Sequence, residues 1–264
     1  LFHALNKTQA WLEGAVPEWI NAAGSRTDPY RSTTDIGHIG KLKESDSIVL
    51  RVTTPHGEKP PSLLHRASYN HYVNATWTAR GAAFTRIAGV NQRWLLAPDT
   101  ASLAAGTTSL TIHDHTNRPN PVLSLPSGTH AVDRLPAIDA QSNALGSMQV
   151  TIEPGYFSYV AQYRGGAAHE GAPNQDDTRP PAREREAFSA LAEEMGLRKL
   201  PPAEAVALVT QWFANGYRYS TYQQDTPVTG SPIVDFLHRS KSGHCEYFAT
   251  ATVLLLRAGG IPAR

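Results

Sequence analysis

The sequence has 264 residues, a length that predicts one large domain or two of ordinary size. Lys and Arg (24) nearly balance Asp and Glu (23), so the net charge is +1 and nothing favours a nucleic-acid partner. No apolar run of about 18 residues occurs, so no segment is predicted to span a membrane. The single cysteine, Cys245, excludes an internal disulfide and a multi-cysteine zinc site.

Composition divides the chain into three regions. Residues 1–165 contain short β-branched runs separated by turn residues, which predicts a β-rich domain of sandwich-like or barrel-like form. An apolar stripe in the first 20 residues predicts a leading helix. Residues 166–182 are polar and rich in Gly and Pro, which is typical of a linker, and residues 183–264 have helical periodicity. The predicted fold class is α+β.

Within the first region, the clearest strand candidate is Ile48–Thr54, which ends before Pro55. Further strands are expected in 83–97 and 102–113. We also expect Met148–Ile152 and Tyr156–Tyr163 to pair with each other around the turn Glu153–Gly155.

Several helices are predicted in the third region. The first covers 183–195 and ends at Gly196; the second begins at Pro201 or Pro202 and ends near Gly216. After a short extended segment at 217–222, Ser231 is expected to cap a short helix. The last helix is predicted from Cys245 to Arg257.

Cys245 is the residue in this sequence with the strongest chemical signal. It follows the turn at Ser242–His244 and falls in the first turn of an apolar helix. The unpaired N–H groups and positive dipole end of such a helix favour a thiolate and can hold a developing oxyanion. Phe248, Ala249, Thr252, Leu255 and Leu256 are expected to face a core. Spacing alone leaves a second interpretation open, that of a buried structural cysteine.

Two motifs between residues 243 and 264 add evidence that the spacing of residues alone does not provide. Gly-His-Cys-Glu-Tyr-Phe-Ala-Thr-Ala begins at Gly243, and Leu-Leu-Arg-Ala-Gly-Gly-Ile-Pro-Ala-Arg ends at Arg264. Together they resemble the core of the transglutaminase-like superfamily. The chain is most similar to bacterial membrane-anchored members, in which a β-rich stretch precedes a periplasmic core.

The resemblance implies a papain-like core with a Cys-His-Asp triad. In it, Cys245 is the nucleophile and its backbone N–H is an oxyanion donor, while Tyr219 matches an aromatic position that assists the oxyanion hole in some members. The implied reaction moves a glutamine acyl group to an amine or to water through a thioester. No cofactor or metal is implied. The substrate would be a protein or peptide carrying glutamine and amine groups.

In the family, the triad His and Asp follow the Ile-Pro-Ala-Arg segment, so we expect both outside these 264 residues. On that expectation the chain is a periplasmic piece of an inner-membrane protein, with the core interrupted after the cysteine motif. The piece alone is then expected to be inactive, and any membrane contact belongs to other segments.

The other polar candidates have weaker signals. His244 is adjacent to Cys245, but neighbouring helix positions do not face each other, and His238 is only a remote candidate. His113 and His115 share a strand face without an identifiable third metal ligand. Glu246 is expected to stabilise the helix start. Arg257 and Arg264 are expected to pair with carboxylates or carbonyls.

Two rival functions remain open from the sequence. A papain-like core can also belong to a cysteine peptidase or amidase. The chain could instead be a non-catalytic scaffold that binds a cell-envelope protein through its β-rich region.

Overall fold

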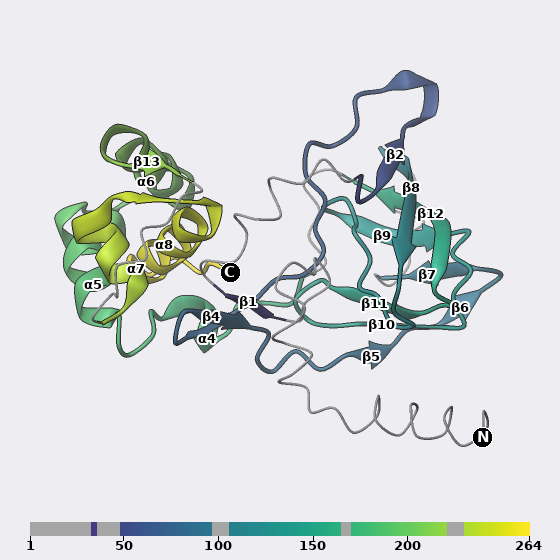
Figure 1. The fold of residues 1–264 in the computed structure, drawn as a ribbon, viewed down its shortest axis with the longest axis horizontal. Helices are drawn as coiled ribbons and strands as arrows, with labels where there is room; N and C mark the ends of the chain where they lie inside the picture. Colours follow the sequence, from purple (N-terminus) through teal and green to yellow (C-terminus); the bar gives the residue numbers. More distant parts are fainter. Residues whose placement is uncertain (1–32, 36–47, 97–105, 165–169, 221–229) are drawn as a thin grey trace, which may run out of the picture.

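The structure is a computed structural model that describes residues 33–35, 48–96, 106–164, 170–220 and 230–264. A β-rich part and a helical part lie side by side (Figure 1). The predicted α+β class is confirmed. The leading helix expected in the first 20 residues lies outside the described residues.

Two antiparallel sheets form the β-rich part. The larger has the strand order β2-β8-β12-β9-β7-β6 and the smaller has the order β11-β10-β5. The strands of the larger sheet are β2 (Arg51–Thr53), β6 (Gly89–Val90), β7 (Arg93–Leu95), β8 (Thr108–Thr116), β9 (Thr129–Asp133) and β12 (Gly155–Tyr163). Those of the smaller sheet are β5 (Thr85–Arg86), β10 (Asp139–Ser142) and β11 (Met148–Thr151). The short helix η1 (Pro55–Gly57) follows β2.

The two sheets share one hydrophobic core. Leu110 and Ile112 of β8 alternate with half-buried or exposed neighbours, as a strand with one buried face requires. They pack in one cluster with Ala140 of β10 and with Met148 and Val150 of β11. The β-rich part is therefore sandwich-like, in agreement with the sequence.

One predicted pairing is wrong. The segments 148–152 and 156–163 are strands, but they do not pair with each other: β11 pairs with β10, and β12 pairs with β8 and β9. The chain crosses from one sheet to the other near Gly155, whose φ is 140°. Instead, β11 forms a hairpin with the strand before it, β10, whereas both partners of β12 are more distant in the chain.

The helical part follows the predicted boundaries closely. Its main helices are α5 (Arg185–Glu194), α6 (Pro202–Gly216) and α8 (Cys245–Ala258), with shorter turns at η2 (Leu197–Lys199), α7 (Pro232–Asp235) and η3 (Phe236–Ser240). Gly196 takes the left-handed conformation after α5, with φ 68°. The expected side-chain cap by Ser231 is wrong, because its hydroxyl donates to Glu184 Oε1 at 2.7 Å.

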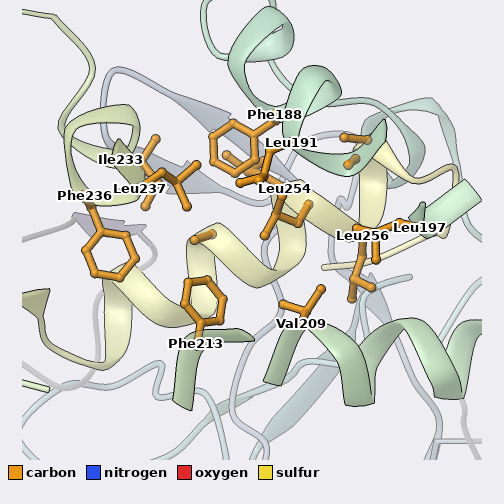
Figure 2. Packing of buried hydrophobic residues seen from close by; sticks show 14 of the residues in the cluster. Phe188, Leu191, Leu197, Val209, Phe213, Ile233, Phe236, Leu237, Leu254 and Leu256 are labelled. Carbon is orange, nitrogen blue, oxygen red and sulfur yellow. The ribbon is translucent and has the colours of Figure 1, made fainter. Parts of the chain in front are cut away.

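Helix α8 crosses the core of this part (Figure 2). Phe188 of α5, Phe213 of α6 and Leu254 of α8 are among its buried side chains. The expected buried face of α8 was partly wrong. Leu255 and Leu256 are buried, but Phe248 and Thr252 are half-buried and Ala249 is exposed, while the other buried members of the helix are Thr250, Ala251, Leu254, Arg257 and Ala258.

A hairpin from the first sequence region completes this helical core. Strands β3 (His71–Val73) and β4 (Thr76–Thr78) are antiparallel, and β4 also pairs with β1 (Thr33–Asp35). Tyr72 and Trp77 are buried in the same cluster as α5, α6 and α8. The hairpin therefore packs with helices that follow it by more than 100 residues.

The expected linker contains the short helix α4 (Gln175–Thr178). A capping box starts it: the Asn174 side chain accepts from Asp176 N at 2.7 Å, and Asp177 Oδ2 accepts from Asn174 N at 2.8 Å. Asp177 is buried. Since Asp177 and the α4 backbone contact the chain end after α8, this segment has a packed structure of its own.

Candidate active site

Cys245 is the first residue of α8, as predicted, and its side chain is half-buried. His244 precedes it in extended conformation as the N-cap. The first backbone N–H groups of a helix have no partner within the helix, so they can serve a cap or an approaching anion. The thiol is therefore attached to a rigid helix, α8, at the positive end of the helix dipole.

The His244 imidazole caps the start of α8. Its Nδ1 accepts a long hydrogen bond of 3.4 Å from Glu246 N and lies 3.6 Å from Glu246 Oε2. The ring is buried and lies edge-on to Tyr247, with ring centroids 5.2 Å apart. Nδ1 is therefore directed at residue 246, and Glu246 occupies the first turn, where a carboxylate stabilises the helix.

Tyr219 lies beside the segment that leads into Cys245. Strand β13 (Arg218–Tyr219) is parallel to β14 (Ser242–Gly243), and Tyr219 is the register partner of Gly243. Ser220 N donates to Gly243 O at 2.9 Å. The Tyr219 ring stacks on Phe248 of α8 at 6.3 Å and is 51% exposed. The two site residues predicted from the sequence therefore belong to adjoining segments.

An aromatic cluster beneath this pair was not predicted from the sequence. Phe213, Tyr217, Phe236 and Phe248 have ring centroids between 4.9 and 6.4 Å apart. Tyr217 donates its phenol proton to Leu237 O at 2.6 Å, and burial raises its pKa to about 12. The cluster packs Tyr217, the residue before β13, against Phe248 of α8. Only the density of aromatic residues could have indicated it.

A cavity of about 350 Å³ lies along α8, starting at Glu246. The walls are mainly apolar, and the lining residues are His65, Ala67, Ser68, Tyr69, Trp77, Glu246, Ala249, Thr250, Val253 and Arg264. Burial lowers the pKa of His65; nearby Arg264 adds to this effect and Glu170 opposes it. These walls favour an apolar group over a charged one.

The remaining histidine candidates lie on elements other than α8. His238 is exposed on η3. His113 and His115 lie on β8 in the β-rich part, where the His115 ring packs on Tyr156 at 4.6 Å. Across the ranges that the structure describes, no group of three or more His, Cys, Asp or Glu side chains is arranged to hold a metal ion.

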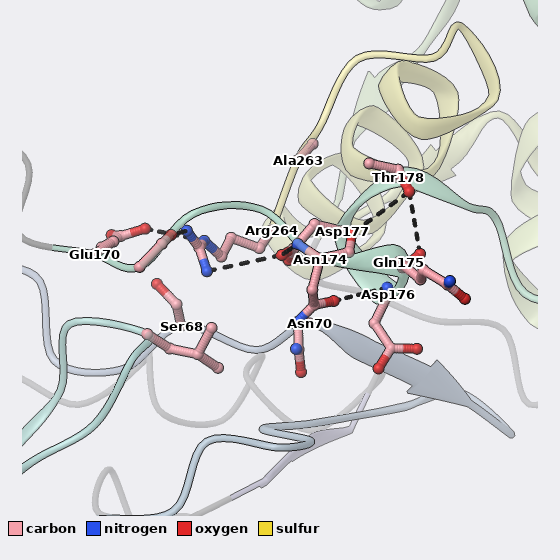
Figure 3. A network of polar contacts seen from close by, with 12 residues as sticks. Ser68, Asn70, Glu170, Asn174, Gln175, Asp176, Asp177, Thr178, Ala263 and Arg264 are labelled. Carbon is pink, nitrogen blue, oxygen red and sulfur yellow. Dashed lines mark hydrogen bonds and ion pairs between the residues drawn. The ribbon is translucent and has the colours of Figure 1, made fainter.

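Both arginines of the second motif are structural, as expected. Arg264 pairs with Glu170 at 2.9 Å, donates to Gly171 O at 2.8 Å and lies 3.8 Å from Asp177 (Figure 3). Arg257 is buried and donates to Ala263 O at 2.8 Å. Burial lowers the pKa of Arg257 to about 10, against the opposing charges of Asp177 and Asp176. Together they fasten the end of α8 to the α4 segment.

The helical part is similar to known proteins. Residues 189–264 match the family model of the Transglutaminase-like superfamily, which confirms the resemblance read from the sequence. The chain is 40% identical over 76 residues to a protein-glutamine gamma-glutamyltransferase of Pseudomonas aeruginosa, a match that covers 28% of this chain and 11% of that protein. It is 42% identical over 52 residues to the uncharacterized protein YebA of Bacillus subtilis, covering 19% and 7%.

The fold as a whole has solved counterparts. The periplasmic domain of TgpA from Pseudomonas aeruginosa matches with a TM-score of 0.67 and 21% identity, over 89% of this chain and 78% of that one. The same domain bound to ethylmercury matches with a TM-score of 0.64 and 20% identity, over 88% and 79%. Within the described ranges, no helix is long and apolar enough to cross a membrane.

Proposed function

We propose that this chain, whose residues 189–264 match the Transglutaminase-like superfamily, supplies the nucleophile of a thiol-dependent acyl transfer. One observation carries the proposal: the single cysteine is the first residue of α8, inside the matched segment. A thiol at a helix start is favoured as thiolate, which is the nucleophilic form.

The proposed chemistry has two stages. The Cys245 thiolate attacks the side-chain carbonyl carbon of a glutamine, and the carbonyl oxygen becomes an oxyanion. The C–N bond then breaks, ammonia leaves with an added proton, and a thioester remains. An amine attacks the thioester, a new amide bond forms, and the proton that the amine loses restores the thiol.

Each group near Cys245 has a proposed role. Its own backbone N–H, directed out of the first helical turn, donates to the oxyanion. Tyr219 supplies an aromatic wall next to it, supported by its pairing with Gly243 and its stacking on Phe248. The general base and its orienting carboxylate are proposed to come from residues outside these 264.

The proposed location is extracytoplasmic, as a periplasmic portion of an inner-membrane protein. The fold match to a periplasmic domain supports this location. The proposed substrate is a protein or peptide with glutamine and amine groups, and no nucleic acid is involved. The name of the Pseudomonas relative, a protein-glutamine gamma-glutamyltransferase, supports glutamine as the acyl donor.

The test uses the full-length gene product with a glutamine-containing peptide and a fluorescent primary amine. We expect amine incorporation with equimolar ammonia release, both lost in Cys245→Ala and both kept in Ser240→Ala, an exposed neighbour. Ammonia release without incorporation, or peptide cleavage, would identify an amidase or peptidase. If Cys245→Ala preserves the biological function of the gene, the chain is a scaffold and the proposal is wrong.

A further inference from the structure

Trp77 of the β3–β4 hairpin contacts α8 at two of its residues. Trp77 of β4 is 6% exposed, and its indole Nε1 donates to Thr250 Oγ1 at 2.8 Å. The face of the same ring lies 5.1 Å from the guanidinium carbon of Arg257. Thr250 and Arg257 are two helical turns apart, so one indole contacts the same face of α8 at two levels.

The hairpin is built to hold this indole still. Asn74 and Ala75 take the left-handed conformation between the strands, as a tight hairpin turn requires. At the open end, the buried Asn70 side chain accepts from Arg80 N at 2.8 Å and donates to Arg80 O at 3.0 Å. Tyr72 packs beside Trp77, with ring centroids 5.1 Å apart.

We infer that Trp77 is a positioning residue for Cys245, an inference that rests on the proposed nucleophilic role of that thiol. Thr250 follows Cys245 by five residues on one rigid helix, so a shift at Thr250 is transmitted to the first turn. At that turn, the helix must present its N–H groups and thiol together. Small displacements of such groups have large effects on reaction rate. The hairpin, which lies outside residues 189–264, therefore acts on the matched segment.

The test measures the second-order rate constant for alkylation of Cys245 by iodoacetamide in the 264-residue chain, well below the melting temperature. Trp77→Phe keeps the ring but removes the N–H donor, and Thr250→Val removes the acceptor at nearly constant shape. We expect each to slow alkylation about threefold or more, and the double variant to be no slower than either. Thr250→Ser, which keeps the hydroxyl, should restore the wild-type rate.

Tyr72→Phe is the matched control. It changes the neighbouring ring of the same hairpin, and its hydroxyl has no hydrogen-bond partner among the described residues. Its alkylation rate should stay at the wild-type value. A lower melting temperature with unchanged alkylation in Trp77→Phe and Thr250→Val would overturn the inference, as would equal slowing by Tyr72→Phe. Alkylation needs no acyl donor, so a wild-type protein without acyl transfer would overturn the proposed function but leave this inference intact.

Discussion

Tyr219 is the register partner of Gly243 in the parallel pair β13–β14, and Gly243 precedes Cys245 by two residues. The pair is short, but Ser220 N and Arg218 N donate into β14 and the preceding Lys241. Because β14 leads directly into α8, the position of the first helical turn depends on how closely these segments approach.

Gly243→Ala tests that approach. A Cβ at this position would lie 3.0 Å from three side-chain atoms of Tyr247, so the chain or the ring must move. We expect a loss of about 1–3 kcal/mol of unfolding free energy, measured by urea denaturation. Gly216→Ala is the control, since apart from the backbone of its own helix no atom of the described residues lies within 4 Å of the added Cβ. It should be neutral or stabilising by up to about 1 kcal/mol. Equal effects of the two variants would contradict close packing at Gly243.

The buried charge of Asp177 is the second target. Its carboxylate accepts from Asn174 N and faces Arg264, and it opposes the fall in the Arg257 pKa. We expect Asp177→Asn to cost about 3 kcal/mol at pH 7, because buried cations lose their counter-charge. Asp176→Asn alters a side chain that is one-third exposed and should cost below about 1 kcal/mol. Indistinguishable denaturation curves for Asp177→Asn and the wild type would show that the α4 segment does not stabilise the end of α8.

The phenol of Tyr217 should make stability depend on alkaline pH. Its pKa is about 12 in the fold against 10.0 when unfolded, so the unfolded chain loses the proton first. This stabilisation is complete below pH 10 and is lost as the pH rises towards 12. Tyr217→Phe also loses the bond to Leu237 O, which costs about 1 kcal/mol at pH 8. The difference in unfolding free energy between wild type and Tyr217→Phe should shrink from pH 9 to pH 11. A constant difference would rule out the raised pKa.

Two substitutions on α8 distinguish its observed face from the one expected from the sequence. Leu254 is fully buried, so Leu254→Ala should cost about 2–5 kcal/mol. Thr252 is half-buried, and its hydroxyl donates to Phe248 O of the same helix. Thr252→Ala should therefore change the unfolding free energy by less than about 0.5 kcal/mol. Thermal denaturation of both variants measures the two losses of unfolding free energy. A larger loss in Thr252→Ala than in Leu254→Ala would show that the assigned buried face is wrong.

The sequence by itself determined the local features of this protein. Helix boundaries from 183 onward, the left-handed turn at Gly196 and the position of Cys245 at a helix start all follow from periodicity and from turn residues close by in the chain. The motifs around Cys245 and Arg264 predicted the resemblance that the family-model match over residues 189–264 bears out, because those residues are contiguous. The roles of Arg257 and Arg264 followed from their place at the end of that helix.

Only the tertiary structure decided which distant segments meet. The strands at 148–152 and 156–163 were predicted, but their partners depend on which sheet buries each apolar face. The docking of Trp77 on Thr250 joins residues 173 positions apart. The buried face of α8 likewise depends on neighbours from several other parts of the chain, among them the β3–β4 hairpin, α5, α6 and α7. Patterns within a short window contain no information about such partners, since burial is a property of the whole fold.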